Sequence, residues 1–266
     1  MYLDQNLKSN LDLAKEGNTK EFDCVCVLFG GEGAGKSRKA QQIAKYWDNS
    51  FNIDDIAFTP EEFAKKVREA AEYKCIIFDE ARTGFNRKRT MSLINKILSD
   101  LLTVIRSRKL FIILCIPDLF DLDSFIVEWR LRFAIRVYTK KFERGYFKFY
   151  SKKRIKQLSI FGRKTKNYYC AKPNFIGRFT NFKVIDDKEY NRRKNKATED
   201  IGSFETSSED RVAELMAKIS ILAKEFKIPQ NTVSERLGVS TRTLQRAKKA
   251  LNSKNEEAVP NATLTE

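Results

Sequence analysis

Residues 24 to 47, CVCVLFGGEGAGKSRKAQQIAKYW, constrain the fold more than any other part of the chain. An apolar run with alternating valines leads into a glycine-rich turn, and a helical pattern follows it. Gly30, Gly35, Lys36 and Ser37 match the pattern G-x-x-x-x-G-K-[ST]. A strand, a phosphate-binding loop and a helix in this order predict an α/β domain built around a nucleotide site.

The residue types of this loop suit phosphate binding. Glycine permits the backbone angles that turn amide groups toward phosphate oxygens, and the next helix points its positive end at the same anion. Lys36 is expected to reach the β and γ phosphates of ATP, and Ser37 to ligate Mg²⁺. The predicted nucleotide-binding residues are Gly30, Gly31, Glu32, Gly33, Ala34, Gly35, Lys36 and Ser37.

A second acidic element is expected in such a site, and the segment KCIIFDE at 74–80 supplies it as an apolar strand that ends in two carboxylates. Asp79 is predicted to hold Mg²⁺ through water. Glu80 is predicted to polarise the attacking water, which favours hydrolysis over phosphotransfer to a small molecule. Lys36 and Glu80 are therefore the predicted catalytic residues of the loop and the strand.

The remaining elements alternate between strand and helix. Thr59, Pro60 and Glu62 form a helix start, which predicts a helix over 60–72 after a strand at 53–58. Further on, we expect a helix, a strand and a hairpin, over the segments 89–109, 109–117 and 129–153. The predicted fold class is an α/β P-loop NTPase with a mostly parallel sheet and a β-hairpin extension, plus a small all-α helix-turn-helix domain.

The composition narrows the classes of partner that the chain is expected to bind. The 51 Lys and Arg against 35 Asp and Glu give a formal charge of +16, which favours nucleic acid, then an acidic membrane surface, over a generic basic surface. With no histidine in the chain, any chemistry must rest on carboxylates, Lys, Arg, Ser and backbone amides. The longest apolar run, 110–117, is too short to span a membrane, and no signal sequence is evident, so we expect a cytoplasmic protein.

The five cysteines, which are odd in number and form no CxxC pair, are expected to be free thiols, with four of them in or beside core strands. A cluster of cations follows the DE pair. Arg82 suits a nucleotide contact or a pairing with nearby acids. Arg87, Lys88 and Arg89, expected in a loop before the next helix, are predicted to contact DNA phosphate. A subunit interface and a solvated loop are the alternatives.

The stretch from the glycine-rich loop to about residue 150 resembles the FtsK and HerA group of ATPases, and within it the zonula occludens toxin-like proteins of filamentous phage and related mobile elements. The motifs that carry the likeness are the strand running into DEA, the helix ending in VIRSRK, and FIILCIPDLFDLDSFI. The resemblance implies an ATP-driven motor that moves or packages DNA. It also implies assembly as a homo-oligomeric ring, for which a hexamer is one option. It also implies that Arg106 or Arg108 reaches a neighbouring subunit's γ-phosphate.

The chain departs from this group in two places. The group commonly ends the next strand with a polar residue that senses the γ-phosphate, whereas this chain has Cys115, Ile116 and Pro117. Filamentous-phage members also carry a membrane span, and the sequence predicts none here.

The C-terminal part predicts a separate module. We expect the ATPase domain to cover 1–190, a polar linker 191–210, a helix-turn-helix domain 211–252 and a disordered tail 253–266. Val239 and Leu244 are expected in its small core together with Ala247. The predicted DNA-reading residues are Ser240, Thr241, Arg242, Thr243, Gln245 and Arg246.

Alternatives remain at two levels. An overlapping helix-turn-helix register places the reading helix at QNTVSERL, and a three-helix bundle that serves oligomerisation would have a similar pattern. For the whole chain, the first hypothesis is a DNA translocase or packaging motor of a virus, phage or plasmid. The second is an ATP-dependent switch at a specific DNA site, and a small-molecule kinase comes third.

Overall fold

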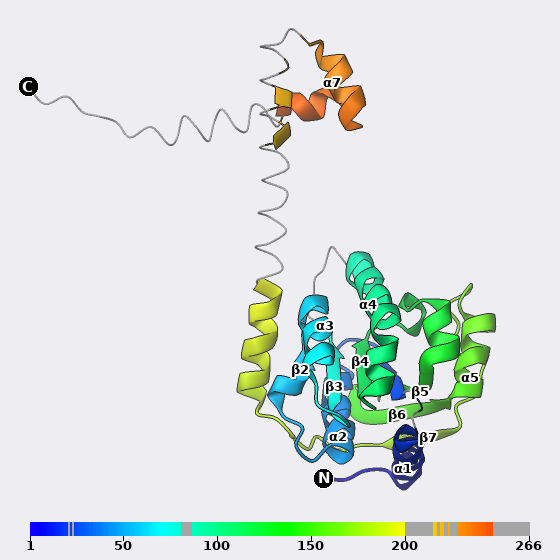
Figure 1. Ribbon diagram of the computed structural model, residues 1–266. Coiled ribbons are helices and arrows are strands. Elements are labelled where there is room, and N and C mark those ends of the chain that lie inside the picture. Colours follow the sequence, from blue (N-terminus) through cyan, green and yellow to red (C-terminus); the bar gives the residue numbers. More distant parts are fainter. Residues whose placement is uncertain are drawn as a thin grey trace, which may run out of the picture. The chain divides into compact units, whose positions relative to one another are not determined.

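The computed structural model (Figure 1) describes residues 1–20, 22, 24–80, 87–199, 215–216, 219–220, 223 and 228–246, with the backbone alone at 87–90 and 102. The chain divides into two units, Met1–Thr198 and Glu199–Glu266. No helix in these described ranges is long and apolar enough to cross a membrane.

The described part of the first unit forms a seven-stranded sheet with the order β2-β3-β4-β1-β5-β6-β7. Neighbours from β2 to β5 are parallel, while β6 and β7 extend the sheet antiparallel. This arrangement confirms the predicted α/β class with a mostly parallel sheet. The strands are β1 (Cys24–Phe29), β2 (Ile56–Ala57), β3 (Cys75–Asp79), β4 (Phe111–Ile116), β5 (Leu131–Lys140), β6 (Glu143–Ser151) and β7 (Phe175–Arg178).

Helices cover both faces of the parallel strands (Figure 1). On one face lie α3 (Pro60–Glu69), α4 (Arg87–Ser107) and α5 (Lys152–Gln157), whose apolar residues join one large cluster. The other face carries α1 (Gln5–Thr19) and α2 (Lys36–Trp47). Because both faces are covered, every residue of β1, β3 and β4 is buried, as is usual for parallel strands.

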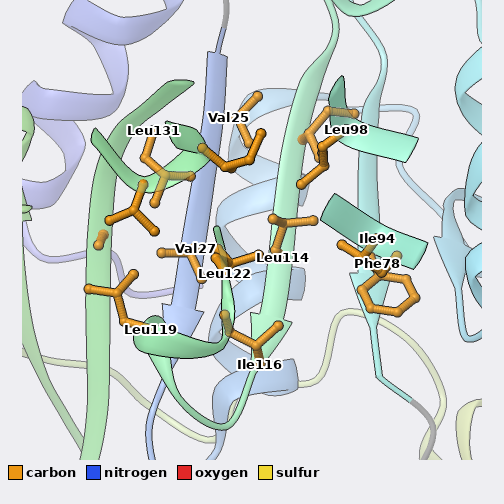
Figure 2. Close-up of a cluster of buried hydrophobic side chains, with 14 of the residues drawn as sticks. Val25, Val27, Phe78, Ile94, Leu98, Leu114, Ile116, Leu119, Leu122 and Leu131 are labelled. Atoms are coloured by element: carbon orange, nitrogen blue, oxygen red, sulfur yellow. The ribbon is translucent and has the colours of Figure 1, made fainter. Parts of the chain in front are cut away.

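The main core lies between the central strands and α4. Val25 and Val27 of β1 pack beside Leu114 of β4, and Ile94 and Leu98 of α4 close the cluster (Figure 2). These strand residues alternate along the chain, so the residues between them point to the α2 face. The core packs against β1 and β4, which pair in parallel and end at the same edge of the sheet.

The segment before α3 differs from the prediction. A strand was expected over 53–58, but Ile53–Asp55 forms a 3-10 helix and only β2 is extended. Asn52 and Asp55 form a capping box, in which the Asn52 amide donates to Asp55 Oδ2 at 2.9 Å. This local hydrogen bonding competes with strand formation.

The predicted start of α3 is confirmed, because the Glu62 amide donates to Thr59 Oγ1 at 3.2 Å and Pro60 is the first helical residue. The helix ends at Glu69 rather than at residue 72. Helix α2 has the predicted bounds, and α4 begins at Arg87. Residues 87–89 therefore open a helix instead of lying in the loop that the sequence predicted.

The predicted linker at 191–210 is wrong over its first part. Residues 187–199 are helical, and the first unit extends to Thr198 rather than ending at 190. Helix 187–199 is held to the core by polar and charged contacts, described below, rather than by an apolar stripe. Hydrophobic periodicity therefore could not reveal it.

The described part of the second unit contains α7 (Gln230–Leu237), a turn at Gly238 and a helical segment at 241–246. Gly238 has a φ of 65°, and the Thr243 amide donates to Ser240 Oγ at 3.1 Å. Its core contains Ala223, Val233 and Leu244, with Val239 packed against it. Ala247 and the expected tail at 253–266 lie outside the described residues.

Cysteine placement follows the expectation for free thiols. Cys24, Cys26, Cys75 and Cys115 are buried, Cys170 is exposed, and none of these five described residues forms a disulfide. Burial raises the pKa of the Cys26, Cys75 and Cys115 thiols well above the ordinary value. These three groups are therefore neutral packing residues.

Candidate nucleotide site

The loop of residues 30–37, here called the phosphate loop, leaves β1 at the carboxyl edge of the sheet. Gly30 has a φ of 139°, and a Cβ at this position would lie 2.0 Å from the Val137 carbonyl oxygen on β5. The Gly30 amide donates to the Pro117 carbonyl at 3.1 Å. Only glycine fits this close approach between strands, so packing by itself requires the first residue of the motif.

At the other end of the phosphate loop, Gly35 caps α2 in the left-handed conformation, with a φ of 100°. A Cβ here would lie 3.2 Å from the ring of Phe179, which packs over the loop from the segment after β7. The Phe179 amide in turn donates to the Gly145 carbonyl at 2.8 Å. The antiparallel half of the sheet therefore holds the phosphate loop from the outside.

Lys36 is the first residue of α2, and its side chain folds back over the loop. Its Nζ donates to the Gly30 carbonyl at 2.7 Å and to the Gly31 carbonyl at 2.9 Å. Burial lowers the pKa of Lys36, the negative charge of Asp79 raises it, and the positive charge of Lys194 lowers it. The ammonium group is thus held inside the loop, where a phosphate oxygen could replace the carbonyls.

Asp79 ends β3 beside Cys115 of β4, and it is only 4% exposed. The Tyr190 hydroxyl donates to Asp79 Oδ2 at 2.5 Å, and Lys194 Nζ donates to Oδ1 at 2.9 Å. Burial raises the pKa of Tyr190, the nearby Asp79 raises it further, and a hydrogen bond with Ser37 lowers it. The tyrosine hydroxyl is therefore bound to Asp79, in the cavity wall that also includes Ser37.

These groups line one cavity of about 700 Å³, within the size range of small-molecule sites. Its wall includes the predicted residues Glu32, Gly33, Gly35, Lys36, Ser37, Asp79 and Glu80. A second cavity of about 460 Å³ lies beside α2, with Gln41, Phe179 and Asn181 in its wall. The two cavities share Gly35 and Ser37, so a ligand with phosphates and a ring system could extend from one to the other.

The two residues predicted to serve Mg²⁺ fit that ion. Ser37 offers a hydroxyl and Asp79 a carboxylate, and both face the same cavity. Mg²⁺ prefers oxygen ligands and is commonly bound through one or two carboxylates together with substrate phosphates. The donor set of this cavity is therefore suitable once a nucleotide supplies phosphate oxygens.

Other predicted residues lie elsewhere. Arg108 follows α4 near the amino end of β4, at the edge of the sheet opposite the phosphate loop, and its Nη1 donates to the Ala70 carbonyl at 2.7 Å. Arg106 lies near the same end of α4 and is exposed. Their predicted role in a neighbouring subunit's site stays a prediction. The side chains of residues 87–89, and Arg82 entirely, lie outside the described residues.

Sequence reasoning missed three residues of the site. Arg144 of β6 lines both cavities, and its Nη2 lies 3.8 Å from where a Cβ on Gly33 would be. Tyr190 and Lys194 reach Asp79 from 111 and 115 residues away. No local motif marks these positions, since Arg144 lies near the start of β6 and helix 187–199 has a polar sequence.

In the second unit, the predicted reading residues share one exposed segment. Ser240, Arg242, Thr243, Gln245 and Arg246 are exposed, Thr241 is half-buried, and Leu244 points into the small core. A helix with polar and cationic side chains on its outer face can donate to phosphates and base edges. This face is the candidate DNA surface of the chain.

Comparisons with known proteins found distant structural likeness. No protein-family model matches the sequence, and no curated protein matches it. One solved structure, the N-terminal domain of zonular occludens toxin from Neisseria meningitidis, is 14% identical, with a TM-score of 0.37 over 64% of this chain and 98% of that one. Another is the genome packaging NTPase B204 of Sulfolobus turreted icosahedral virus 2 in complex with AMP, which is 12% identical, with a TM-score of 0.25 over 51% of this chain and 95% of that one.

Proposed function

We propose that the chain is an ATP-hydrolysing, DNA-binding protein that acts as a DNA translocase or as a genome packaging or transfer motor of a virus, phage or plasmid. One observation carries the enzymatic part: Lys36, Ser37, Asp79 and Glu80 meet around a single cavity at the carboxyl edge of the sheet. Residues 37 and 79 are far apart in the chain. The fold brings them together because β4 lies between β1 and β3 and all three strands end at the same edge.

Each residue has a role in the proposed hydrolysis. The amides of the phosphate loop and Lys36 bind the phosphate chain, and Arg144 adds positive charge beside Gly33. Ser37 and Asp79 hold Mg²⁺, which when bound neutralises developing charge on the phosphates. Glu80 orients and polarises the attacking water. The low exposure of Asp79 strengthens these electrostatic interactions.

Two features support DNA as the partner. The chain carries a formal charge of +16, and the exposed segment at 240–246 offers serine, threonine, glutamine and arginine side chains. In addition, α4 runs back toward the amino end of β4, so its first residues, Arg87, Lys88 and Arg89, lie toward the edge that carries the nucleotide site. Cations placed there could couple DNA contact to hydrolysis.

Assembly into a ring belongs to this proposal through the resemblance stated above. In such a ring, Arg106 or Arg108 would act on a neighbouring subunit's nucleotide. Arg108 would have to exchange its bond with the Ala70 carbonyl for that contact.

A second candidate function is an ATP-dependent switch that loads, partitions or regulates at a specific DNA site. The side chains at 240–246 favour it, because they can read base edges, and a processive motor has little need of sequence recognition. The two candidates differ in what DNA does to the ATPase.

The steady-state rate of ATP hydrolysis, with and without long double-stranded DNA, tests the proposal. A motor is expected to hydrolyse ATP severalfold faster with DNA and faster still on longer duplexes, while Glu80→Gln stays inactive under both conditions. Slow hydrolysis that ignores DNA, together with DNA binding that depends on ATP, favours the switch. Full hydrolysis by Glu80→Gln contradicts the assigned site.

A further inference from the structure

Helix 187–199 and the segment before it are fixed across the nucleotide site. Gln42 Nε2 on α2 donates to the Thr180 carbonyl at 2.8 Å and to the Phe182 carbonyl at 3.1 Å. Arg38 Nη2, just after the phosphate loop, pairs with Asp187 Oδ1 at 2.6 Å. These contacts start the helix directly beside α2.

The same helix, which is yellow in Figure 1, continues past β2. The ring of Tyr190 packs edge-on against that of Phe58, with 5.5 Å between centroids. Arg193 Nη1 pairs with Asp54 Oδ1 at 2.7 Å. One face of the helix is thereby pinned at three successive turns, and its middle turn faces Asp79.

Tyr190 and Lys194 occupy both oxygens of the carboxylate that is proposed to serve Mg²⁺. The tyrosine hydroxyl donates to Oδ2 at 2.5 Å, the lysine donates to Oδ1 at 2.9 Å, and the two side chains are themselves 3.2 Å apart. Ser37 and Tyr190 line the same cavity. The Tyr190 hydroxyl and the Lys194 ammonium group therefore occupy the Asp79 carboxylate, on the wall of the cavity that also includes Ser37.

For electrostatic reasons, these contacts of Asp79 compete with the binding of magnesium nucleotide. Lys194 compensates the charge of Asp79, whose side chain is only 6% exposed, and a buried carboxylate without a partner would be costly. Mg²⁺ at the same carboxylate provides that compensation in place of the ammonium group. Two cations on one buried carboxylate repel each other, so occupancy by one disfavours the other.

We propose that Tyr190 and Lys194 form an intramolecular plug that competes with magnesium nucleotide for the carboxylate of Asp79. Binding of the magnesium nucleotide displaces the two side chains and loosens helix 187–199 from the core. The second unit begins at Glu199, the last residue of this helix, so nucleotide occupancy changes the chain segment that leads into that unit. This inference rests on the proposed function, because it assumes that the cavity takes ATP with Mg²⁺.

Equilibrium binding at varied Mg²⁺ tests the plug without using catalysis. The full chain is titrated with Mg²⁺ at a fixed concentration of mant-AMP-PNP, a fluorescent and non-hydrolysable ATP analogue. Lys194→Met removes the competing charge, and Tyr190→Phe removes the hydroxyl while keeping the ring on Phe58. Each variant is expected to reach half-maximal binding at about tenfold lower Mg²⁺, as for one hydrogen bond to a charged group. Lys196→Met, at an exposed position of the same helix, is the matched control and is expected to behave as wild type.

Hydrogen exchange of the wild-type protein supplies a second readout. The amides of helix 187–199 are expected to lose protection when Mg²⁺ and AMP-PNP are added together, and to keep it with AMP-PNP and EDTA. Stable or increased protection with the magnesium complex overturns the proposal, since it would show that the helix stays in place.

The binding experiment separates two kinds of failure. Weaker binding by Lys194→Met or Tyr190→Phe overturns the plug, because it makes these residues part of the nucleotide site. Unchanged Mg²⁺ dependence in both variants overturns it as well, although nucleotide binding by the wild type then still supports the proposed function. No binding by wild type or variants at any Mg²⁺ concentration contradicts the proposed function and the plug with it.

Discussion

The two walls of the nucleotide cavity are built in different ways. The phosphate loop is shaped by its backbone: Gly30 and Gly35 adopt positive φ angles, and a Cβ at Gly30 would lie 2.0 Å from the Val137 carbonyl oxygen. The opposite wall, helix 187–199, is held by hydrogen bonds and ion pairs of side chains. A wall fixed by close packing cannot move without unfolding the sheet edge. A wall fixed by polar contacts can exchange them, so we assign binding to the first wall and regulation to the second.

The largest expected effect is on the loop wall. Lys36→Ala is expected to lower the ATP hydrolysis rate by about a hundredfold to a thousandfold, because it removes the cation that faces the phosphates. Lys45→Ala is the matched control, since Lys45 lies on the same helix and its Nζ donates to the Asn49 carbonyl, near the helix end. DNA binding is expected to persist in both variants. Substantial hydrolysis by Lys36→Ala would mean that another part of the chain holds the phosphates.

A paired glycine substitution measures how rigid that wall is. Gly30→Ala is expected to lower the free energy of unfolding by about 3 kcal/mol, because the new Cβ meets the Val137 carbonyl and the φ angle is unfavourable. Gly31→Ala, with no atom within 4 Å of the new Cβ, is expected to change it by less than about 0.5 kcal/mol. Urea denaturation of both variants provides the comparison. Equal effects at the two positions would remove the argument that packing requires Gly30.

Two lysines sharpen the comparison between the walls. Lys39 on α2 is fully buried between the rings of Phe147 and Phe179, and its Nζ has no hydrogen-bond partner among the described residues. Burial lowers its pKa to about 8. Lys194, by contrast, pairs with Asp79. Burial of the charged Lys39 therefore destabilises the folded state, whereas Lys194 stabilises it by compensating the buried charge of Asp79.

Lys39→Met is therefore expected to raise the free energy of unfolding at pH 7 by about 2 kcal/mol. The variant removes part of the free energy that burying the charged lysine costs the folded state. Because the folded state binds fewer protons than the unfolded state above pH 8, wild-type stability rises with pH between about 8 and 10.5, and the advantage of the variant shrinks. Denaturation of wild type and variant at pH 7 and pH 10 tests whether the stability advantage of Lys39→Met shrinks as the pH rises. An advantage that stays constant with pH would show that packing, rather than charge, sets the effect.

Lys194→Met is expected to act in the opposite direction without nucleotide, lowering the free energy of unfolding, because it leaves Asp79 buried without its cation. Denaturation in EDTA at pH 7 measures this difference. If Lys194→Met instead stabilised the protein, Lys194 would destabilise the fold as Lys39 does. This result would contradict the role of Lys194 as the stabilising partner of Asp79.

The smallest expected effect lies in the second unit. Arg242→Ala is expected to weaken double-stranded DNA binding by about 1 kcal/mol and to reduce the slope of log affinity against log salt by about 1, while hydrolysis without DNA is unchanged. Arg242→Lys keeps the charge and is expected to keep the slope. DNA binding measured over a salt series distinguishes them. An unchanged slope in Arg242→Ala would remove this residue from the DNA surface.

The sequence predicted the fold class, the central strands and the loop wall, because each rests on local patterns: a glycine motif, buried runs that end in acid, and a capped helix start at Thr59. It did not predict helix 187–199. The contacts of that helix are polar, and its partners Asp54 and Asp79 lie more than a hundred residues away. Nor could periodicity show that Asn52 and Asp55 would turn an expected strand into a 3-10 helix. Such contacts depend on which surfaces the fold brings together.

A crystal structure of the full chain with Mg²⁺ and AMP-PNP tests the central claim most directly. The account predicts the triphosphate against the amides of the phosphate loop, Mg²⁺ between Ser37 and Asp79, and the side chains of Tyr190 and Lys194 withdrawn from that carboxylate. A nucleotide bound away from residues 30–37, or Mg²⁺ held without Ser37 and Asp79, would contradict it.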